Sequence, residues 1–585
     1  MMTCSIRGLG RVAVAVMAVG ATPPDVLRAQ PAASPTPMAA FADVWLDRFA
    51  RTHPSIAAGN GLHRYDDRLE DFSASAIRHE IAQLRRDRTT LAAMSDASWS
   101  ADDRVDRRIL LGIIDGWLLD LDRVRTWQRN PMIYAAAIAD GVHDLMIKDA
   151  TPAATRMAQV AAKLRAVPGL LAAARTNLQN PPAIFCERGA AMFDGAAGMV
   201  SRDLALAFPA PSPERDSLIA LGIRTAPLLA AYATDLRALA RTATGDWRVG
   251  ADAVRARYAA EELIDLPLDT LLALAARELV RNQQAFADAA RRVDATRPPR
   301  DVWAQMVRDH PARGGVVTAA RTAVDSLSAF VARRGLAALP TDAAPRVAAA
   351  QPFAIGLASM HASPPLEPVP VPSYYYITDA DSTWDASRQD AWLERFNRWS
   401  LVNTSAHEVM PGHWLHAMAM RATPGKVRRI WIGLNPFPQP SSGQDGWAHY
   451  AEQLVVDEGF GNGDPRYRMA QASDALTRIV RLVSGIRMHR GDWSIADAQQ
   501  AFEREAYVPS AAARREAERS TYDPTNGGYF LGKLALLTLR ADLQALEGAA
   551  FDLRRFHERV MRHGIAPWWA HRALMLPNDT RPVLR

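Results

Sequence analysis

The sequence predicts a mainly α-helical protein with little β structure, large enough for two lobes around a central cleft. Alanine, leucine, arginine, glutamate and glutamine dominate the chain, and all of them favour helix. Apolar residues recur three or four positions apart over long stretches, whereas the alternation typical of strands is scarce. A chain of 585 residues exceeds what one simple core usually serves, so we expect either one large helical unit or two lobes around a cleft.

The first 29 residues have the layout of a secretory signal peptide. Arg7 and Arg11 make the start weakly basic, and an apolar run follows at residues 12–21. This run is too short to span a bilayer. We therefore predict an exported protein, periplasmic or secreted, with no stable membrane insertion after cleavage. Residues 30–40 are rich in Pro, Ala and Ser and are predicted to be a linker.

Three stretches in the body of the chain carry the clearest helical pattern. In Ala153–Thr176, Leu218–Arg241 and Leu268–Arg292, apolar residues are spaced as on one face of a helix. The best strand candidate is Tyr374–Ile377, which follows the Pro-rich stretch Pro364–Pro372.

The Pro-rich stretch also divides the chain into two portions that differ in the motifs they carry. A helical N-terminal portion, residues 41–363, precedes a helical C-terminal portion, residues 364–585, which carries the chemical motifs described below. We interpret this as a division of function, with residues 41–585 forming one continuous catalytic unit.

Charge and cysteine content narrow the possible functions. The net charge is +6, but only four of the 69 basic residues are lysine, and the 65 arginines are interleaved with acidic residues. The chain has no dense basic block, so we do not expect a nucleic-acid partner. After signal cleavage Cys186 is the one cysteine left, which excludes an intrachain disulfide and a cysteine-based metal site. Any metal ligands should therefore be histidines and carboxylates.

A histidine-rich stretch reads His-Glu-Val-Met-Pro-Gly-His and begins at His407. It resembles the zinc signature H-E-x-x-H, in which two histidines bind zinc and the glutamate is a general base. His407 and His413 are six positions apart and diverge by about 240° on an ideal helix. Pro411 and Gly412 break a regular helix, and a kink there can bring His413 back beside His407. The alternative second ligand, His416, faces away from His407 on a straight helix and ranks lower.

A second motif begins at Asp445 and reads Asp-Gly-Trp-Ala-His-Tyr-Ala-Glu. On a helix, Asp445, His449 and Glu452 lie within about 60° of one another, and the apolar residues of the motif lie on the other side. Alone, this polar stripe would be typical of a solvated surface helix. Some thirty residues after a His-Glu-x-x-Pro-Gly-His segment, it is more consistent with a metal ligand and a supporting carboxylate.

Together the two motifs resemble the family called domain of unknown function 885 (DUF885), whose members look like helical, zincin-like, zinc-dependent peptidases. The family pattern is His-Glu-x-x-Pro-Gly-His followed by Glu-Gly-Trp-Ala-x-Tyr-x-Glu. The first part is intact at residues 407–413, whereas Asp445 replaces the usual Glu in the second. The similarity covers residues 374–575, including segments at Gly485–Trp493 and Tyr522–Leu539.

The resemblance implies that His407 and His413 bind one catalytic Zn²⁺ and that Glu408 acts as general base. The third ligand is either Asp445, whose position is similar to a ligand glutamate in other zinc peptidases, or Glu452. We narrowly favour Asp445 and leave Glu452 as the ligand or its support. Because Asp is one methylene shorter than Glu, its helix would have to approach more closely.

Candidates for the donor that stabilises the oxyanion are Tyr522, Tyr529 and His489. The predicted function is an exported zinc hydrolase that cleaves short peptides or chain ends. Two alternatives remain: a binding or scaffold protein of the same fold with weakened turnover, and a metal-dependent hydrolase of a non-peptide amide. The sequence gives no indication of the oligomeric state.

Overall fold

The computed structural model describes residues 35–148, 150–340, 344–350, 357–430 and 441–585. It is 70% helix and 2% strand, which confirms the prediction of a mainly α protein with little β structure.

The predicted signal peptide, residues 1–29, lies outside the described residues, as do residues 30–34 of the predicted linker. Helix α1 (Pro37–Thr52) begins inside that linker, so residues 37–40 are helical and the linker prediction is wrong there. The hydroxyl of Thr36 accepts the N–H of Ala39, and Pro37 occupies the first turn. A capping hydroxyl and a proline at the first position both favour a helix start, which outweighs the linker-like composition.

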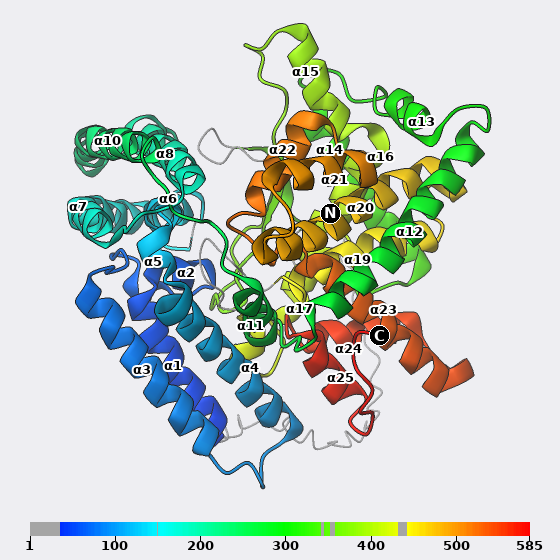
Figure 1. Cartoon of the computed structure of the whole chain (residues 1–585), viewed down its shortest axis with the longest axis horizontal. Coiled ribbons are helices and arrows are strands. Elements are labelled where there is room, and N and C mark those ends of the chain that lie inside the picture. The colour runs from blue at the N-terminus through cyan, green and yellow to red at the C-terminus, as the bar shows by residue number, and fades with distance from the viewer. Residues whose placement is uncertain (1–34, 149, 341–343, 351–356, 431–440) are drawn as a thin grey trace, which may run out of the picture.

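Residues 37–240 form two groups of helices, which are coloured blue to green on the left of Figure 1. The first group contains α1, α2 (Pro54–Gly59), η1 (His63–Tyr65), α3 (Ala74–Ala93), α4 (Ala101–Leu118), η2 (Leu119–Val124) and α5 (Thr126–Arg129). The second group contains α6 (Met132–Ile147), α7 (Ala153–Asn177), α8 (Ala183–Gly198), η3 (Met199–Asp203), α9 (Leu204–Ala207) and α10 (Pro213–Ala240).

From residue 251 onwards, most of the helices lie on the other side of the molecule (Figure 1). Those before the first histidine motif are α11 (Ala251–Glu261), α12 (Leu268–Val293), α13 (Pro299–Met306), α14 (Val316–Arg334), α15 (Ala386–Leu393) and η4 (Glu394–Phe396). The later ones are α16 (Arg398–Glu408), α17 (His413–Met420), α18 (Lys426–Arg429), α19 (Gln444–Asp457), η5 (Phe460–Gly463), α20 (Pro465–Arg490), α21 (Ile495–Glu505), α22 (Ser510–Arg519), α23 (Gly528–Glu547), η6 (Gly548–Ala550), α24 (Leu553–Arg562) and α25 (Trp568–Met575).

The three helices predicted from apolar spacing are present as α7, α10 and α12, with bounds close to those expected. α7 and α10 pack with α8 around a core of their own, which includes Phe193 and Tyr232. α12 packs along α20, so it belongs to the half of the molecule that carries the histidine motifs.

The largest hydrophobic core joins residues from both sides of the predicted division at residue 364. It includes Tyr258 and Leu327 from the N-terminal portion and Trp447 and Leu531 from the C-terminal portion. The division is therefore not a packing boundary.

The small sheet lies at this same division. Strands β1 (Arg346–Ala349), β2 (Ala358–His361) and β3 (Tyr374–Ile377) run in the order β1-β3-β2, with β1 parallel and β2 antiparallel to β3. The predicted strand is confirmed as β3, and the Pro-rich stretch is the connection between β2 and β3. Tyr375 is buried beneath the sheet, and its hydroxyl lies 3.4 Å from that of Ser405 on α16. The sheet is thus fixed to the helix that carries His407.

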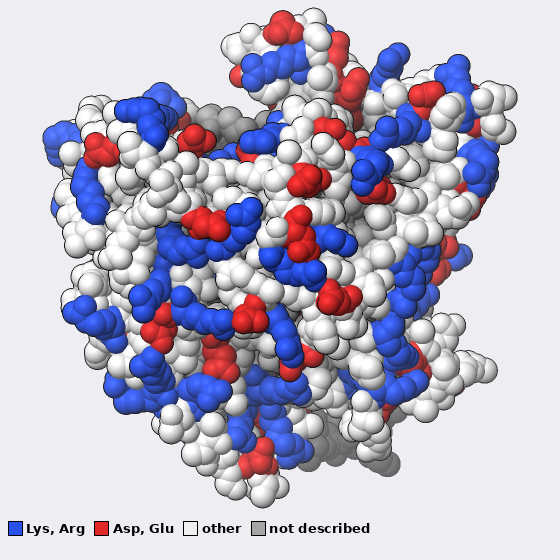
Figure 2. Space-filling view, viewed as in Figure 1, with Lys and Arg blue, Asp and Glu red and all other residues white. Residues whose placement is uncertain are grey.

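Figure 2 shows Lys and Arg interspersed with Asp and Glu over the visible face, in agreement with the dispersed arginines of the sequence.

Among the described residues, α10 is long and apolar enough to cross a membrane by length and composition, although one of its faces packs on α7 and α8. Such a helix is weak evidence for a membrane span, because helices of soluble cores have the same composition.

Candidate metal centre

The two histidines of the first motif converge because the helix ends between them. α16 ends at Glu408, and α17 starts at His413. The intervening turn packs so closely that a Cβ on Gly412 would lie 1.8 Å from the carbonyl oxygen of His407. Only glycine fits such an approach. The imidazole rings of His407 and His413 have centroids 4.7 Å apart, so the predicted convergence across Pro-Gly is confirmed.

Helix α19 brings a carboxylate to this pair. Oδ1 of Asp445 lies 3.5 Å from Nε2 of His413 and 3.8 Å from Nε2 of His407. One ligand atom from each of the three residues lies within 4.8 Å of the others. Ligand atoms about 2.0–2.1 Å from a tetrahedral zinc ion are about 3.4 Å apart, so the group fits Zn²⁺ after small side-chain adjustments.

The close approach of α19 has a visible cause in its packing. The indole N–H of Trp447 donates to the carbonyl of Pro411 at 2.9 Å, which ties α19 to the turn between the two histidines. A Cβ on Gly446 would lie 2.7 Å from Cα of Gly532 on α23, so α19 and α23 touch at their backbones. This packing lets the shorter Asp445 side chain reach the histidines.

Glu452 lies behind His407. Its Oε1 accepts a hydrogen bond from Nδ1 of His407 at 2.7 Å, and its Oε2 accepts one from Nδ1 of His449 at 3.0 Å. A proton on Nδ1 leaves the Nε2 lone pair of His407 facing Asp445 and His413. Carboxylates in this position orient a metal-binding histidine and increase its basicity. Asp445 thus lies beside the Nε2 atoms of the two histidines, and Glu452 lies on the other side of His407, in contact with its Nδ1.

Glu408 lies at the rim of the same group. Its carboxylate accepts the backbone N–H of Met360 on β2. Burial raises the pKa of Glu408, and Asp445 raises it further against the opposing charge of His413. A carboxylate with a raised pKa is suited to accept and return a proton near neutral pH. The side chain of Asp445 remains 24% exposed, so solvent reaches the group.

The electrostatics around the ligand atoms keep His407 neutral. Burial and the neighbouring His413 and Arg478 hold the pKa of His407 well below its usual value. Burial opposes the charged forms of His413 and Asp445 too, but their mutual attraction outweighs it and raises the pKa of His413 while lowering that of Asp445. His407 and Asp445 are thus held in the forms that bind a metal ion, the neutral imidazole and the ionised carboxylate, whereas His413 must lose its proton when a metal binds.

Two cations near Glu452 were not among the predicted site residues. Arg478, on α20, donates to Oε1 of Glu452 at 2.8 Å, and in a chain with 65 arginines nothing distinguishes it. Lys533, on α23, is buried, and burial lowers its pKa to about 7 despite the nearby Glu452. Arg478 lowers the pKa of Glu452 and so keeps that carboxylate ionised beside His407, although burial opposes this.

Of the three predicted oxyanion donors, the structure brings one to the group. Tyr529 starts α23, and the charge of Asp445 is the main cause that raises its pKa, so the two side chains are close. The guanidinium of Arg481 lies 5.9 Å from the centroid of the Tyr529 ring.

His489 and Tyr522 lie elsewhere, and their predicted role is corrected. His489 is eleven residues beyond Arg478 on α20, roughly 16 Å along the helix axis. Its Nε2 donates to the carbonyl of Ser520, and its Nδ1 accepts the N–H of Val249. Tyr522 contacts Arg188 and lines a small cavity together with His489.

The alternative ligand His416 also lies apart from the group. Its Nε2 donates to the carbonyl of Gly564 at 3.2 Å, and burial lowers its pKa to about 4. His416 is therefore a structural histidine that joins α17 to the end of α24.

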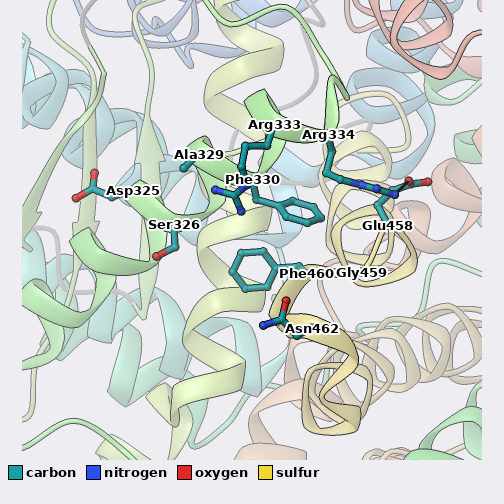
Figure 3. A pocket seen from close by; sticks show the side chains of 11 residues that line it. Asp325, Ser326, Ala329, Phe330, Arg333, Arg334, Glu458, Gly459, Phe460 and Asn462 are labelled. Atoms are coloured by element: carbon teal, nitrogen blue, oxygen red, sulfur yellow. Dashed lines mark hydrogen bonds and ion pairs between the residues drawn. The ribbon is translucent and has the colours of Figure 1, made fainter.

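A surface cavity of about 680 Å³ lies between α14 and η5 (Figure 3). Phe330 and Phe460 form its floor, and Arg334 pairs with Glu458 at its edge. None of the predicted site residues lines this cavity, so its volume does not bear on the metal centre.

The comparisons with known proteins concern the family and the fold. A family model described as "Bacterial protein of unknown function (DUF885)" matches residues 54–570. No curated protein matches significantly. Two similar solved structures are each described as a "putative lipoprotein". The one from Shewanella oneidensis, of unknown function, has a TM-score of 0.76 and 22% identity over 92% of this chain and 99% of its own. The one from Colwellia psychrerythraea has a TM-score of 0.75 and 16% identity over 93% and 99%.

Proposed function

The chain belongs to the DUF885 family, and we propose that it is an exported zinc-dependent hydrolase that cleaves short peptides or chain ends. The observation that carries the proposal is the convergence of His407, His413 and Asp445, with Glu452 behind His407. Three ligand atoms with a supporting carboxylate and partial exposure to solvent are typical of a catalytic zinc site.

The side chains around this group have complementary chemistry for amide hydrolysis. Zinc held by His407, His413 and Asp445 would activate water and polarise the substrate carbonyl. Glu408 takes a proton from the attacking water and returns it to the nitrogen of the departing amine. The hydroxyl of Tyr529 donates a hydrogen bond to the carbonyl oxygen as negative charge develops there.

The edge strand β2 favours a peptide as the substrate. The carbonyl of Leu357, just before β2, accepts the N–H of Thr378, just after β3. Because hydrogen-bonded pairs alternate along two antiparallel strands, every second residue of β2 turns its N–H and C=O groups away from β3. Met360 is one of them, and its N–H points to Glu408. An extended peptide laid along this edge would form main-chain hydrogen bonds beside the general base.

The alternative of a scaffold with weakened turnover rested on the replacement of Glu by Asp at position 445. The distances of 3.5 and 3.8 Å from Asp445 to the two histidines favour the enzyme over this alternative. A zincin-like arrangement and export to the periplasm or medium belong to the same proposal. The two structural relatives, described as lipoproteins, are consistent with a location in or beyond the cell envelope.

Metal analysis combined with a peptide library tests the proposal. The purified protein is expected to bind one zinc ion per chain and to cleave a set of short peptides, with both properties lost in His413→Ala. Asp445→Ala should lose the metal, whereas Glu452→Ala should only weaken its binding. A wild-type protein that binds no zinc, or whose peptide cleavage persists after full removal of metal, would refute the proposal.

A further inference from the structure

Glu262 is a buried carboxylate whose partners lie far away in sequence. It caps the C-terminal end of α11, and its Oε1 accepts the backbone N–H of Ser441 at 2.7 Å. The N–H of Ser442 lies 3.2 Å from both of its oxygens, and the Ser442 hydroxyl donates to it as well. The carboxylate of Glu262 thus accepts several hydrogen bonds from a single turn.

This arrangement differs from that of the neighbouring buried acid. Glu261, one residue earlier, is paired with the guanidinium of Arg257 at 3.0 Å. The hydrogen-bond partners of Glu262 are neutral groups, and a buried carboxylate is costly unless such bonds replace its water. A Cβ on Gly528 would lie 2.9 Å from Oε1 of Glu262, so α23 also encloses the carboxylate.

The turn that Glu262 binds leads directly into the helix of the metal ligand. The carbonyl of Ser441 accepts the N–H groups of Asp445 and Gly446 at 3.0 and 3.2 Å. Gly443, at the N-cap of α19, has no side chain that could accept a hydrogen bond from the free N–H groups of the first turn. An anion beside a helix N-terminus stabilises that end of the helix. Glu262, at the end of α11, therefore holds the turn before α19 in place, which the N-cap residue of α19 cannot do.

We propose that Glu262 is a positioning residue for the metal centre, holding the turn at residues 441–443 so that the carboxylate of Asp445 stays within reach of both histidines. The inference rests on the proposed function, because it assumes that Asp445 is the third ligand. It gives the N-terminal portion a direct part in a site whose ligands all lie in the C-terminal portion.

The positioning role of Glu262 is tested by measuring zinc affinity in competition with a chromogenic chelator. The melting temperature and the Co²⁺ absorption spectrum are recorded in parallel. Glu262→Ala should weaken zinc binding by about tenfold to hundredfold, the usual effect of losing a residue that orients a ligand. Glu262→Gln, which keeps an acceptor for Ser441, should lose less. The control is Glu261→Gln, which removes the charge of a buried carboxylate one residue away and should lower the melting temperature while leaving zinc affinity and the Co²⁺ spectrum unchanged.

A double variant separates positioning from general stability. If Glu262 acts through Asp445, Glu262→Ala should cause little further loss of zinc affinity in an Asp445→Asn background. An equal loss in both backgrounds, or wild-type zinc affinity in both Glu262 variants, would overturn the inference while leaving the proposed function intact. A wild-type protein without zinc would instead overturn the proposed function, and this inference with it. If Glu262→Ala does not fold, Glu262→Gln carries the comparison.

Discussion

Nδ1 of His407 and Oε1 of Glu452 lie 2.7 Å apart, although 45 residues separate them in the chain. This contact fixes which nitrogen of His407 carries the proton and directs the other towards Asp445 and His413. It also explains why α19 places two carboxylates on one stripe: Asp445 lies beside the ligand nitrogens, and Glu452 lies one layer behind them.

Replacing Glu452 with Gln should weaken zinc binding without abolishing it. The amide keeps the volume of the side chain but loses the charge that orients and polarises His407, so we expect about a tenfold to hundredfold loss of affinity. Competition with a zinc chelator measures this. The matched control is Glu458→Gln, at the end of the same helix, where the carboxylate pairs with Arg334 instead. Equal losses in the two variants would contradict the assigned role.

Gly412→Ala should disrupt the metal centre. The added Cβ would lie 1.8 Å from the carbonyl oxygen of His407, so the turn or the end of α16 must move and the two imidazoles must separate. We expect a lower melting temperature and loss of stoichiometric zinc.

The control for this substitution is Gly195→Ala in α8. That Cβ meets nothing within 4 Å, and a helical alanine is more stable than glycine by roughly 0.5–1 kcal/mol. The melting temperature should therefore fall, and zinc should be lost, in Gly412→Ala alone, whereas Gly195→Ala should keep its metal and melt at the same or a slightly higher temperature. Retention of zinc by this variant would contradict the account of the convergence.

The two histidines of the candidate metal centre could be predicted more fully than the residues around them, because their convergence depends on local backbone geometry. The break between His407 and His413 follows from Pro411 and Gly412, whose backbone restrictions can be read from sequence. The sequence favoured Asp445 over Glu452 only narrowly, because both lie on one stripe of α19 and only the neighbouring helices decide which one faces the histidines.

Residues whose role depends on packing across the chain were not identified. Glu262 acts on a turn 179 residues later, and no spacing rule connects the two. His489 and Tyr522 were chosen because their motifs accompany the histidine motif, but α20 carries His489 away from the site. Strands β1 and β2 were missed because four-residue strands without alternating pattern gain their stability from pairing with β3.

Tyr529→Phe should lower turnover without loss of metal. The phenol lies close to Asp445, and removing a donor to the developing oxyanion usually lowers kcat by about a hundredfold or more with little change in KM. Steady-state kinetics on a cleaved peptide measures the change. Tyr522→Phe is the control, because Tyr522 contacts Arg188 away from the centre and its loss should leave kcat unaltered. Similar kinetics for both variants would exclude Tyr529 as the donor.

The stability of the fold should depend on pH through His63. This side chain lies 2.7 Å from Asp66 and 2.7 Å from Glu367, so it joins the N-terminal helices to the segment before β3. The hydrogen bond and charge of Asp66, with those of Glu367, raise its pKa to about 9 against the opposing effect of burial. Because the folded pKa exceeds the unfolded value of 6.5, the contribution is complete below pH 6.5 and is lost as the pH rises through about 9.

Melting temperatures of wild type and His63→Gln across this range test that dependence. The difference in stability should be largest below pH 6.5, at roughly 3 kcal/mol at most, and should shrink towards zero above pH 9. The exposed His79 offers a control, since His79→Gln removes no buried contact and should cause only a small change in stability. A difference for His63→Gln that stays constant from pH 6 to 10 would contradict the assignment.

The central claim is that Glu408 moves a proton in a zinc-dependent cleavage of peptides. The most direct test compares the wild type and Glu408→Gln, both loaded with one equivalent of zinc, for peptide hydrolysis and metal affinity. We predict that the variant binds zinc as tightly as the wild type but hydrolyses peptides at least about a hundredfold more slowly, because the amide cannot accept the proton. Equal hydrolysis by the two proteins, or a wild type that neither binds zinc nor cleaves peptides, would contradict the claim.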